Sequence, residues 1–253
     1  MKGLKILWIL AFFHLAASAL HAAPASTWEC PRAFENFETD TVGTFPTSYK
    51  SFDDGDLKKA IQNNVYTVAE ENGNKFLRAV AQGSGVIIYR EADGWDLSEY
   101  PALRWRWRVH KSPAKGDERY IRSNDAAAAV YVIWKSSVIM RVKSIKFTWS
   151  STLDLGTHMS KRFGNDNLHV QNNFRAPLGE WIEETVDVRA LYKKYFDKKD
   201  GEELEKPIAI AVLSDRDQTE SAAEADYDDI ALCRGVNASP QPASVAPATA
   251  PKR

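Results

Sequence analysis

The stretch Pro101-Ala-Leu-Arg-Trp-Arg-Trp-Arg-Val109 alternates between apolar and basic side chains without interruption. The two sets are Leu103, Trp105, Trp107 and Val109 on one parity, and Arg104, Arg106 and Arg108 on the other. Successive side chains of a β-strand point to opposite faces, so this alternation predicts an amphipathic strand. One of its faces enters an indole-rich core, and the opposite face carries a row of guanidinium groups.

Short runs with the composition of β-strands follow along the rest of the chain, separated by turn-forming residues. These runs are 34–38, 65–69, 76–81, 86–90, 126–134, 139–149, 180–188, 208–213 and 227–233. One helix is predicted after Asp187, which can cap it, because apolar residues recur at a spacing of three and four from Val188 to Phe196. We therefore predict an all-β fold, a jelly-roll-like antiparallel β-sandwich with one short helix.

The two ends of the chain differ in composition from the middle. Residues 1–25 combine lysines near the start, an apolar stretch from Ile6 to Leu20 and a small-residue exit at Ala23-Pro-Ala25. This order predicts a secretory signal peptide, with an uncleaved N-terminal anchor as the alternative. Residues 235–253 are rich in Ala, Pro and Ser, which predicts a disordered tail. Residues 28–234 remain as a single β-sandwich domain.

The net charge and the hydropathy of the chain restrict the classes of partner and the cellular location that we expect. Lys and Arg number 33 against 34 Asp and Glu, and this near-zero balance argues against nucleic acid as a partner. No later segment resembles a membrane span, so we predict none in the mature protein. The expected location is outside the cytoplasm, either periplasmic or extracellular.

The chain has two cysteines, and they stand at opposite ends of the predicted domain. Cys30 begins it and Cys233 ends it. In an oxidising compartment this placement predicts a disulfide bond between the first and last strands. Two free buried thiols are the alternative.

The row formed by Arg104, Arg106 and Arg108 is the first candidate ligand-binding feature. Three guanidinium groups on one strand face suit a uronic-acid glycan, a phosphate or a carboxylate. The alternative is that acids on adjacent strands, such as Glu183 or Asp228, neutralise the row.

A second candidate site lies in the loop Ser214-Asp-Arg-Asp-Gln-Thr-Glu220, which leaves the end of an apolar run. Asp215 and Asp217 are its candidate ligand-binding residues, together with Asp125 from the polar stretch before another apolar run. Oxygen ligands at alternate positions suit calcium. However, the usual twelve-residue calcium loop would need glycine where Glu220 stands and glutamate at Asp226. A polar loop whose acids cap turns is the alternative.

A candidate metal site could join the two ends of the domain. Asp228 and Asp229 begin the last strand, and Glu35 and Glu38 lie on the first. Adjacent ends would bring carboxylates such as Glu35 and Asp229 around one structural calcium, a pattern found in carbohydrate-binding modules of this general architecture. Calcium is thus the candidate cofactor.

No standard catalytic signature is present. The sequence contains no G-x-S-x-G elbow, no H-E-x-x-H motif and no glycine-rich phosphate loop. Paired carboxylates for glycoside cleavage stay open, because a sequence gives no separations between acids. We predict no catalytic residue. Whether the protein is an enzyme stays open, and the absence of these motifs favours a protein without enzymatic activity.

Several short motifs occur together in a characteristic order. They are Leu103-Arg-Trp-Arg-Trp107, Asn124-Asp-Ala126, Thr148-Trp-Ser150, Leu155-Gly-Thr157, Leu178-Gly-Glu-Trp181, Ser214-Asp-Arg-Asp-Gln-Thr219 and Tyr227-Asp-Asp-Ile230. As a set they resemble the bacterial family called domain of unknown function 3047, over about Phe34 to Leu232. Where Asp-Ser-Asp-Asn-Thr is expected, this chain has Asp215-Arg-Asp-Gln-Thr219, which puts a cation inside the acidic loop. The resemblance implies an exported bacterial protein with a sandwich fold and no assigned activity.

The leading functional hypothesis is a non-catalytic binding module of the cell envelope, for a saccharide or another small polar ligand. The eight tryptophans and nine tyrosines suit sugar stacking, although they suit a β-sandwich core equally well. One alternative is a structural or interaction component that binds another envelope protein. The other is a glycan-acting hydrolase or lyase.

Overall fold

The computed structural model describes residues 27–81, 83, 85–136, 142–161 and 165–236. The predicted signal peptide lies outside the described residues, as do residues 237–253 of the predicted tail. In the described part, no helix is both long and apolar enough to cross a membrane.

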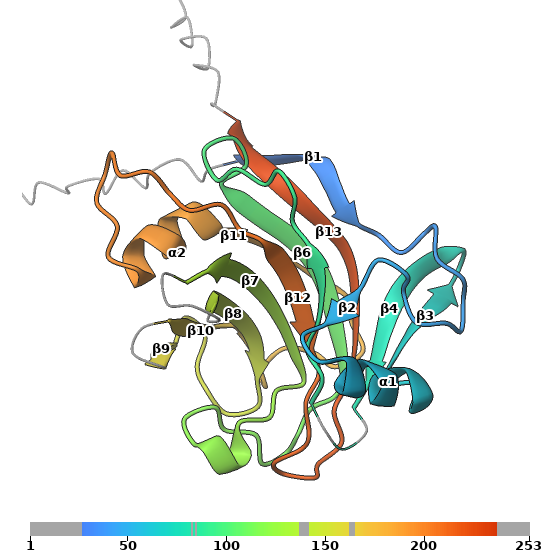
Figure 1. Cartoon of the computed structure of the whole chain (residues 1–253). Helices are drawn as coiled ribbons and strands as arrows, with labels where there is room; N and C mark the ends of the chain where they lie inside the picture. Colours follow the sequence, from blue (N-terminus) through green and yellow to red (C-terminus); the bar gives the residue numbers. More distant parts are fainter. Residues whose placement is uncertain (1–26, 82, 84, 137–141, 162–164, 237–253) are drawn as a thin grey trace, which may run out of the picture.

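Two β-sheets pack face to face, as the sequence predicts (Figure 1). The first sheet has the order β11-β6-β13-β4-β3, and β1 also pairs with β13. Its strands are β1 (Thr27–Glu35), β3 (Tyr66–Glu71), β4 (Asn74–Val80), β6 (Ala102–Lys111), β11 (Ile182–Asp187) and β13 (Glu224–Val236). The alternating residues 102–109 lie in β6, an interior strand of this sheet between β11 and β13.

The second sheet has the order β2-β5-β12-β7-β8-β10-β9. Its strands are β2 (Lys50–Ser51), β5 (Ile88–Glu91), β7 (Ala128–Lys135), β8 (Val142–Ser150), β9 (His158–Lys161), β10 (Asp166–Asn173) and β12 (Ala209–Leu213). Its pairs are antiparallel apart from β8 and β10, which run parallel.

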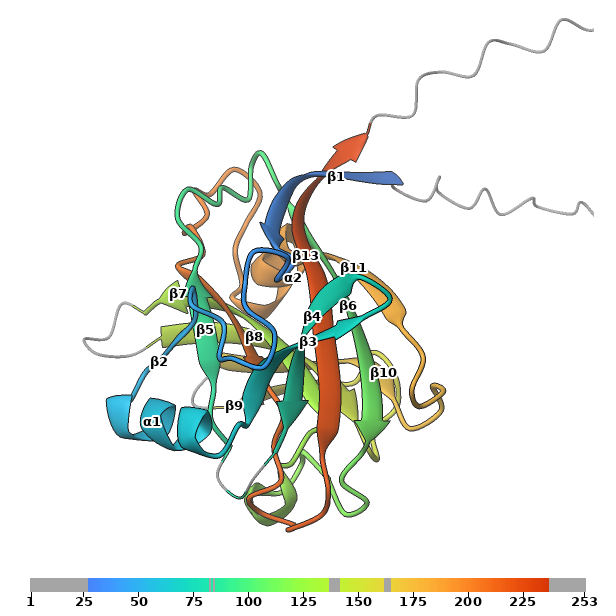
Figure 2. The ribbon, with the colours of Figure 1, turned by 90° about the vertical axis from the view of Figure 1, so that its right-hand side faces the viewer.

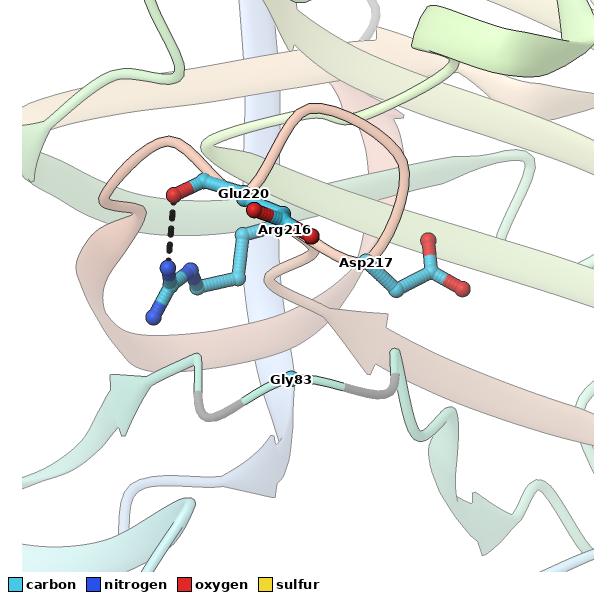
Figure 3. Close-up of a pocket in the computed structure, with 4 residues that line it drawn as sticks. All are labelled: Gly83, Arg216, Asp217 and Glu220. Atoms are coloured by element: carbon cyan, nitrogen blue, oxygen red, sulfur yellow. Dashed lines mark hydrogen bonds between the residues drawn. The ribbon is translucent and has the colours of Figure 1, made fainter.

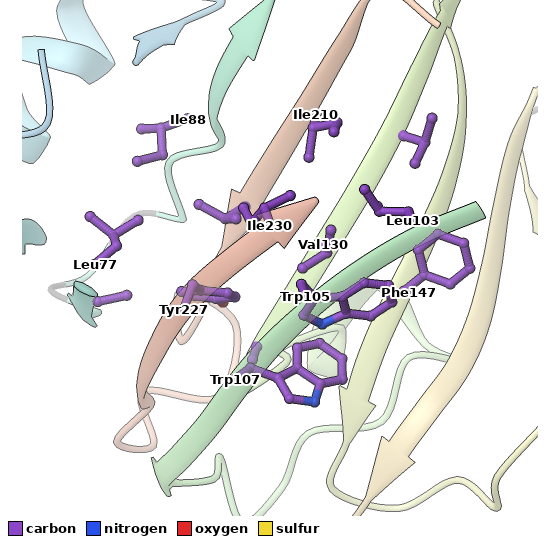
Figure 4. Packing of buried hydrophobic residues seen from close by; sticks show 14 of the residues in the cluster. Leu77, Ile88, Leu103, Trp105, Trp107, Val130, Phe147, Ile210, Tyr227 and Ile230 are labelled. Carbon is purple, nitrogen blue, oxygen red and sulfur yellow. The ribbon is translucent and has the colours of Figure 1, made fainter. Parts of the chain in front are cut away.

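The core lies between the two sheets and is built largely from aromatic side chains. Trp105 and Trp107 of β6 are fully buried, and the ring centroid of Trp105 lies 5.4 Å from that of Phe147 of β8 (Figure 4). The ring centroid of Trp107 lies 5.8 Å from that of Trp149, also of β8. Burying one indole removes on the order of 200 Å² from water, a gross gain of about 5 kcal/mol. The strict alternation of β6 therefore fixes which of its faces points inward.

The long strand β13 connects the parts of the first sheet. Along one edge, the first part of β13 pairs with β4 and the last part pairs with β1. Strand β6 pairs with β13 along the opposite edge (Figure 2). Cys30 of β1 and Cys233 of β13 form a disulfide bond, which confirms the predicted pairing. Strand β13 continues to Val236, because Gly235 and Val236 pair with β1.

The first strand begins earlier and ends earlier than the run 34–38 suggested. Strand β1 ends at Glu35, and Phe37 follows in a loop with a positive φ of 57° and a fully buried ring. The ring of Phe37 packs into the core from this loop, and its spacing of three residues from Phe34 is not that of a strand face.

Helix α2 (Val188–Tyr195) is the helix that the sequence predicts. The carboxylate of Asp187 accepts a hydrogen bond from the backbone nitrogen of Ala190 at 2.8 Å, which satisfies one free donor of the first turn. Helix α1 (Asp54–Gln62) was not predicted. Asp53 caps it, but its apolar residues are only Leu57, Ala60 and Ile61, and Ala60 is the one buried among them, so its apolar face is short.

Strands β2, β9 and β10 were also not predicted. Strand β10 reads Asp-Asn-Leu-His-Val-Gln-Asn-Asn, and its four amide side chains conceal the β-type alternation of Leu168 and Val170. These two apolar side chains form a small cluster with Leu153 outside the main core. A 3-10 turn, η1 (Ile121–Ser123), lies in the loop before β7.

Candidate functional site

The row of Arg104, Arg106 and Arg108 lies on the outer face of the first sheet, and acids on neighbouring elements neutralise it. The ion pairs join Arg104 to Glu183 at 3.8 Å, Arg106 to Asp228 at 2.5 Å and Asp229 at 3.0 Å, and Arg108 to Asp226 at 2.7 Å and Glu71 at 2.8 Å. Two of these guanidinium groups also stack on Trp181 at 4.7 Å. Each arginine of the row thus has a carboxylate partner inside the protein, and we leave the row out of the ligand site.

Asp226 forms the centre of this outer layer. Its fully buried carboxylate accepts hydrogen bonds from Arg78 at 2.9 and 3.0 Å and from Arg108 at 2.7 Å, and it contacts His110 Nε2 at 2.7 Å. Burial alone would raise the pKa of Asp226, but the hydrogen bonds from Arg78, His110 and Arg108 together lower it below the ordinary value of 3.8. The layer is a structural ion network.

The three predicted aspartates come together at one end of the second sheet. Strand β12 ends at Leu213 and β7 begins at Ala128, and the loops next to these ends carry Asp215, Asp217 and Asp125. One carboxylate oxygen from each lies within 4.8 Å of the others. The arginine row is on the outer face of the other sheet, so the structure separates the six predicted ligand-binding residues into two sets.

Asp125 holds the loop that follows β12. It is fully buried, and its Oδ1 accepts from the backbone nitrogen of Gln218 at 3.1 Å. Its Oδ2 accepts from the backbone nitrogen and the hydroxyl of Thr219 at 2.7 and 2.5 Å. This carboxylate caps the turn, as the alternative interpretation of the loop expected, and thereby positions the side chains on either side.

Asp215 is a carboxyl group whose surroundings favour its protonated form. Burial, followed by repulsion from Asp217 and Asp125, raises its pKa to about 6, against a lowering hydrogen bond from the Asp217 backbone. Gly85 lies against it: a Cβ there would come within 2.3 Å of Asp215 Oδ1. Glycine at position 85 is therefore what lets the carboxylate keep this place.

Lys146 is a buried cation beside the aspartates that the sequence analysis did not single out. It is 8% exposed, and burial lowers the pKa of its ammonium. Its Nζ lies 5.7 Å from the centre of the Tyr131 ring, within electrostatic reach of Glu118, Asp215 and Asp125. Lys146 forms no ion pair with any residue that the structure describes. A lysine at an outward position of β8 was the signal available in the sequence.

A hollow of about 500 Å³ adjoins this cluster. Its lining residues are Gly83, Arg216, Asp217 and Glu220, and Figure 3 shows the three charged residues on one loop, with Gly83 across from them. Nη2 of Arg216 donates to the backbone oxygen of Glu220 at 2.6 Å, and its Nε is buried with no partner among the described residues. The volume of the hollow falls within the usual range for small-molecule sites, about 300–1,000 Å³.

The donor set of this cluster does not fit a metal ion. The oxygens of Asp125 already accept three hydrogen bonds, and the cations of Lys146 and Arg216 lie close by. The other candidate metal ligands are engaged elsewhere. Glu35 binds Arg90 at 2.7 Å and Ser48 at 2.9 Å, and Asp229 contacts Arg106 at 3.0 Å. Among the described residues, neither belongs to a group of three acids with metal-like spacing.

The comparison with solved structures finds carbohydrate-binding modules, a xyloglucanase domain and a xylanase. The chain is similar to a family 30 carbohydrate-binding module of a cellulosomal cellulase of Clostridium thermocellum, with 13% identity, 75% of this chain and 87% of that chain covered, and a TM-score of 0.37. It is similar to a family 11 module from Clostridium thermocellum in complex with a mixed-linked tetrasaccharide, with 8% identity, coverage of 79% and 94%, and a TM-score of 0.39.

A third similarity is to the xyloglucanase domain of NopAA from Sinorhizobium fredii, with 12% identity, coverage of 64% and 81%, and a TM-score of 0.34. Each of these TM-scores is below 0.5, so we base no argument about ligand or activity on them.

No curated protein matches the chain. A family model does match it, over residues 51–231, and its description reads "Protein of unknown function (DUF3047)". The matched range contains β6, the acidic loop after β12 and Lys146. The chain therefore belongs to this family, domain of unknown function 3047.

Proposed function

We propose that the protein binds a saccharide, or another neutral ligand rich in hydroxyl groups, in the hollow beside Asp217. The observation that carries the proposal is the lining of that hollow. One guanidinium group and two carboxylates, from Arg216, Asp217 and Glu220, line it together. A hydroxyl group both donates and accepts hydrogen bonds, so a polyol can satisfy such a mixed set of partners at once.

The charges that line the hollow disfavour an anionic ligand. The acids Asp217 and Glu220 and the cation Arg216 line it, and Asp125 and Asp215 lie in the adjoining cluster with Asp217. An excess of carboxylates repels anions such as uronic acids or phosphates. A neutral saccharide avoids this repulsion.

We also infer that the protein works outside the cytoplasm. The disulfide bond between Cys30 and Cys233 supports this, because such bonds persist mainly in oxidising compartments. The composition of the first 25 residues supports it independently.

The binding proposal predicts selective affinity for neutral glycans. On a glycan array, and then by isothermal titration with cello-, manno- and chito-oligosaccharides, we expect binding that oligogalacturonate does not reproduce. Asp217→Asn should weaken this binding about tenfold or more, since a hydrogen bond to a charged group is lost.

Asp154→Asn is the matched control for Asp217→Asn. Asp154 is an exposed acid in an ion pair with Arg175 on another loop, so its substitution should leave affinity unchanged. Binding of anionic glycans alone, or of no glycan at all, would contradict the proposal.

Hydrolysis of the bound glycan is the second candidate function, and one observation favours it. Carboxylate oxygens of Asp215 and Asp217 lie within 4.8 Å of each other, and Asp215, with a pKa of about 6, keeps its proton better than an ordinary carboxyl. Retaining glycosidases pair a protonated acid with an ionised one at about 5–5.5 Å.

This second candidate predicts the release of reducing ends from the same oligosaccharides. The rate should fall as the pH rises above about 6, because the acid form of Asp215 is lost. Asp215→Asn and Asp217→Asn should each abolish hydrolysis. If the wild type releases no reducing ends, or both variants still do, the protein only binds.

A further inference from the structure

Two histidines and a tyrosine join the end of helix α2 to the edge of the second sheet. His158 of β9 and His169 of β10 lie directly opposite each other in the antiparallel pairing of these strands. Tyr195, the last residue of α2, contacts both of them. Its ring stacks on that of His158 with centroids 3.8 Å apart, and its hydroxyl oxygen lies 2.8 Å from Nδ1 of His169. We call these three residues the histidine–tyrosine cluster.

The contact between His169 and Tyr195 lies on the core side of β10, while His158 is exposed at the sheet edge. His169 pairs with Phe147 in the register of β8 and β10, and the two rings lie 6.2 Å apart. Phe147 and Tyr195 both belong to the main hydrophobic cluster, and Tyr195 is 9% exposed. A charge on the half-buried ring of His169 therefore loses part of its hydration.

The groups around His169 favour its neutral form. Burial, followed by repulsion from His158 and Lys194, lowers the pKa of His169 below its ordinary value of 6.5. The ammonium of Lys194 lies 5.7 Å from the centre of the Tyr195 ring. Nε2 of His158 lies 3.0 Å from Oδ1 of Asn167, an oxygen that accepts a hydrogen bond from a neutral imidazole. Neutral imidazoles thus form both hydrogen bonds without a buried charge.

Glu184 of β11 packs against β10 near the cluster, but other groups hold its carboxylate. It accepts from the side-chain amides of Gln171 and Asn172 at 2.8 and 3.0 Å, and burial raises its pKa. Gln171 stands two residues beyond His169 on the strand. Among the described residues, the charged groups that shift the pKa of His169 are His158 and Lys194, both cationic when protonated.

We propose that the histidine–tyrosine cluster makes the last turn of α2 responsive to pH. Where both imidazoles are neutral, Tyr195 fixes the end of the helix on β9 and β10. In mildly acidic surroundings the imidazoles gain protons, so like charges face each other beside Lys194 and the last turn leaves the sheet edge. Phe196 leaves with it and loses its contact with the Trp134 ring, now at a centroid distance of 6.0 Å. Both sheets keep their pairing, so the change stays local to α2.

The direction of the pKa shift sets the pH range of this response. A histidine whose pKa is lower in the folded state contributes its full stability above the unfolded value of 6.5. The contribution is lost as the pH falls through the folded pKa. Asp215, with a pKa of about 6, also titrates in this range, but it lies in the loop after β12. A measurement confined to α2 therefore distinguishes the two groups.

Hydrogen exchange of the full chain at about pH 7.5 and about pH 5, corrected for the intrinsic rates, tests the proposal. In acid the amides at the end of α2 should lose protection, while those of β6 and β13 keep theirs. An NMR titration of His169 in the wild type should give a midpoint below 6.5. His169→Gln, which is neutral at both pH values, should remove the response. His110→Gln on β6 is the matched control and should keep it.

Each of the contrary outcomes overturns the proposal. Equal protection of α2 at both pH values, or a loss of protection spread evenly over the domain, contradicts a local response. A midpoint of His169 at or above 6.5 removes the cause of the response. An undiminished response in His169→Gln assigns it to another group. The exchange and the titration of the wild type decide the question even if a variant does not fold.

Discussion

Loss of the bond between Cys30 and Cys233 is expected to lower the free energy of unfolding by about 4–5 kcal/mol. The two cysteines are 203 residues apart, so the bond closes almost the whole folded chain into one loop. An unfolded chain with that cross-link has far fewer conformations, and the entropy it loses stabilises the folded state. For a domain of this size the melting temperature should fall by roughly 10–20 °C.

Circular dichroism monitors urea or thermal unfolding of the wild type, with and without reductant. The double variant with Cys30→Ser and Cys233→Ser separates the bond from the chemistry of the reductant. It should match the reduced wild type, and reductant should not change it further. Equal midpoints for oxidised and reduced wild type would contradict the expected loop effect.

Replacement of Asp226 is expected to be the most damaging single change on the outer face of the first sheet. Asp226→Asn leaves Arg78, Arg108 and His110 without the carboxylate that they share, and Arg108 is itself 8% exposed. Removal of one partner from a buried ion network costs about 3–5 kcal/mol, because the remaining charges stay desolvated. Urea unfolding at neutral pH measures this loss.

The same network predicts how stability depends on pH. The pKa of Asp226 is lower in the folded state than its ordinary value of 3.8. A group of this kind contributes its full stability above the unfolded pKa, and the contribution is lost as the pH falls through the folded pKa. The difference in stability between wild type and Asp226→Asn should therefore be constant near neutrality and shrink below about pH 4.

Asp228→Asn is the matched control, because Asp228 is also buried on the same strand two residues away. Burial raises the pKa of Asp228 despite hydrogen bonds from Asn74 and Arg106, so the fold does not favour its ionised form. Arg106 also keeps a second carboxylate, Asp229 at 3.0 Å. The substitution should cost much less at neutral pH. Equal losses for the two variants would contradict the network described here.

Patterns of a few residues were enough to predict much of the fold. The period of two in β6 predicts a strand with a buried indole face, and the structure places Trp105 and Trp107 there. The cap at Asp187 predicts α2 in the same local way. The sequence did not predict helix α1 and strand β10, because α1 has little apolar surface and amide side chains dominate β10. A regular spacing of buried apolar residues is what reveals an element in a sequence, and this spacing is weak in both.

The sequence predicted which acids belong to the candidate site, but it did not predict how their side chains are arranged. Asp125 and Asp215 are 90 residues apart, and the sequence alone could suggest only that both stand beside buried strands. The hydrogen bonds that make Asp125 a loop cap, and the burial that raises the pKa of Asp215, depend on the pairing of β7 with β12. The sequence places Lys146 at an outward position of β8, but the acids near it there depend on the fold.

The sequence by itself determined the alternation of inward and outward side chains, the antiparallel sandwich and the pairing of its two cysteines. The alternation and the sandwich follow from local rules, since side-chain parity in a strand and the hydrophobic effect act on neighbouring residues. The disulfide follows from there being two cysteines, which allow one pairing. Only the tertiary structure decided that acids neutralise the arginine row while three aspartates from two loops gather at one end of the second sheet. Charges interact through space, and their partners depend on which strands the fold brings side by side.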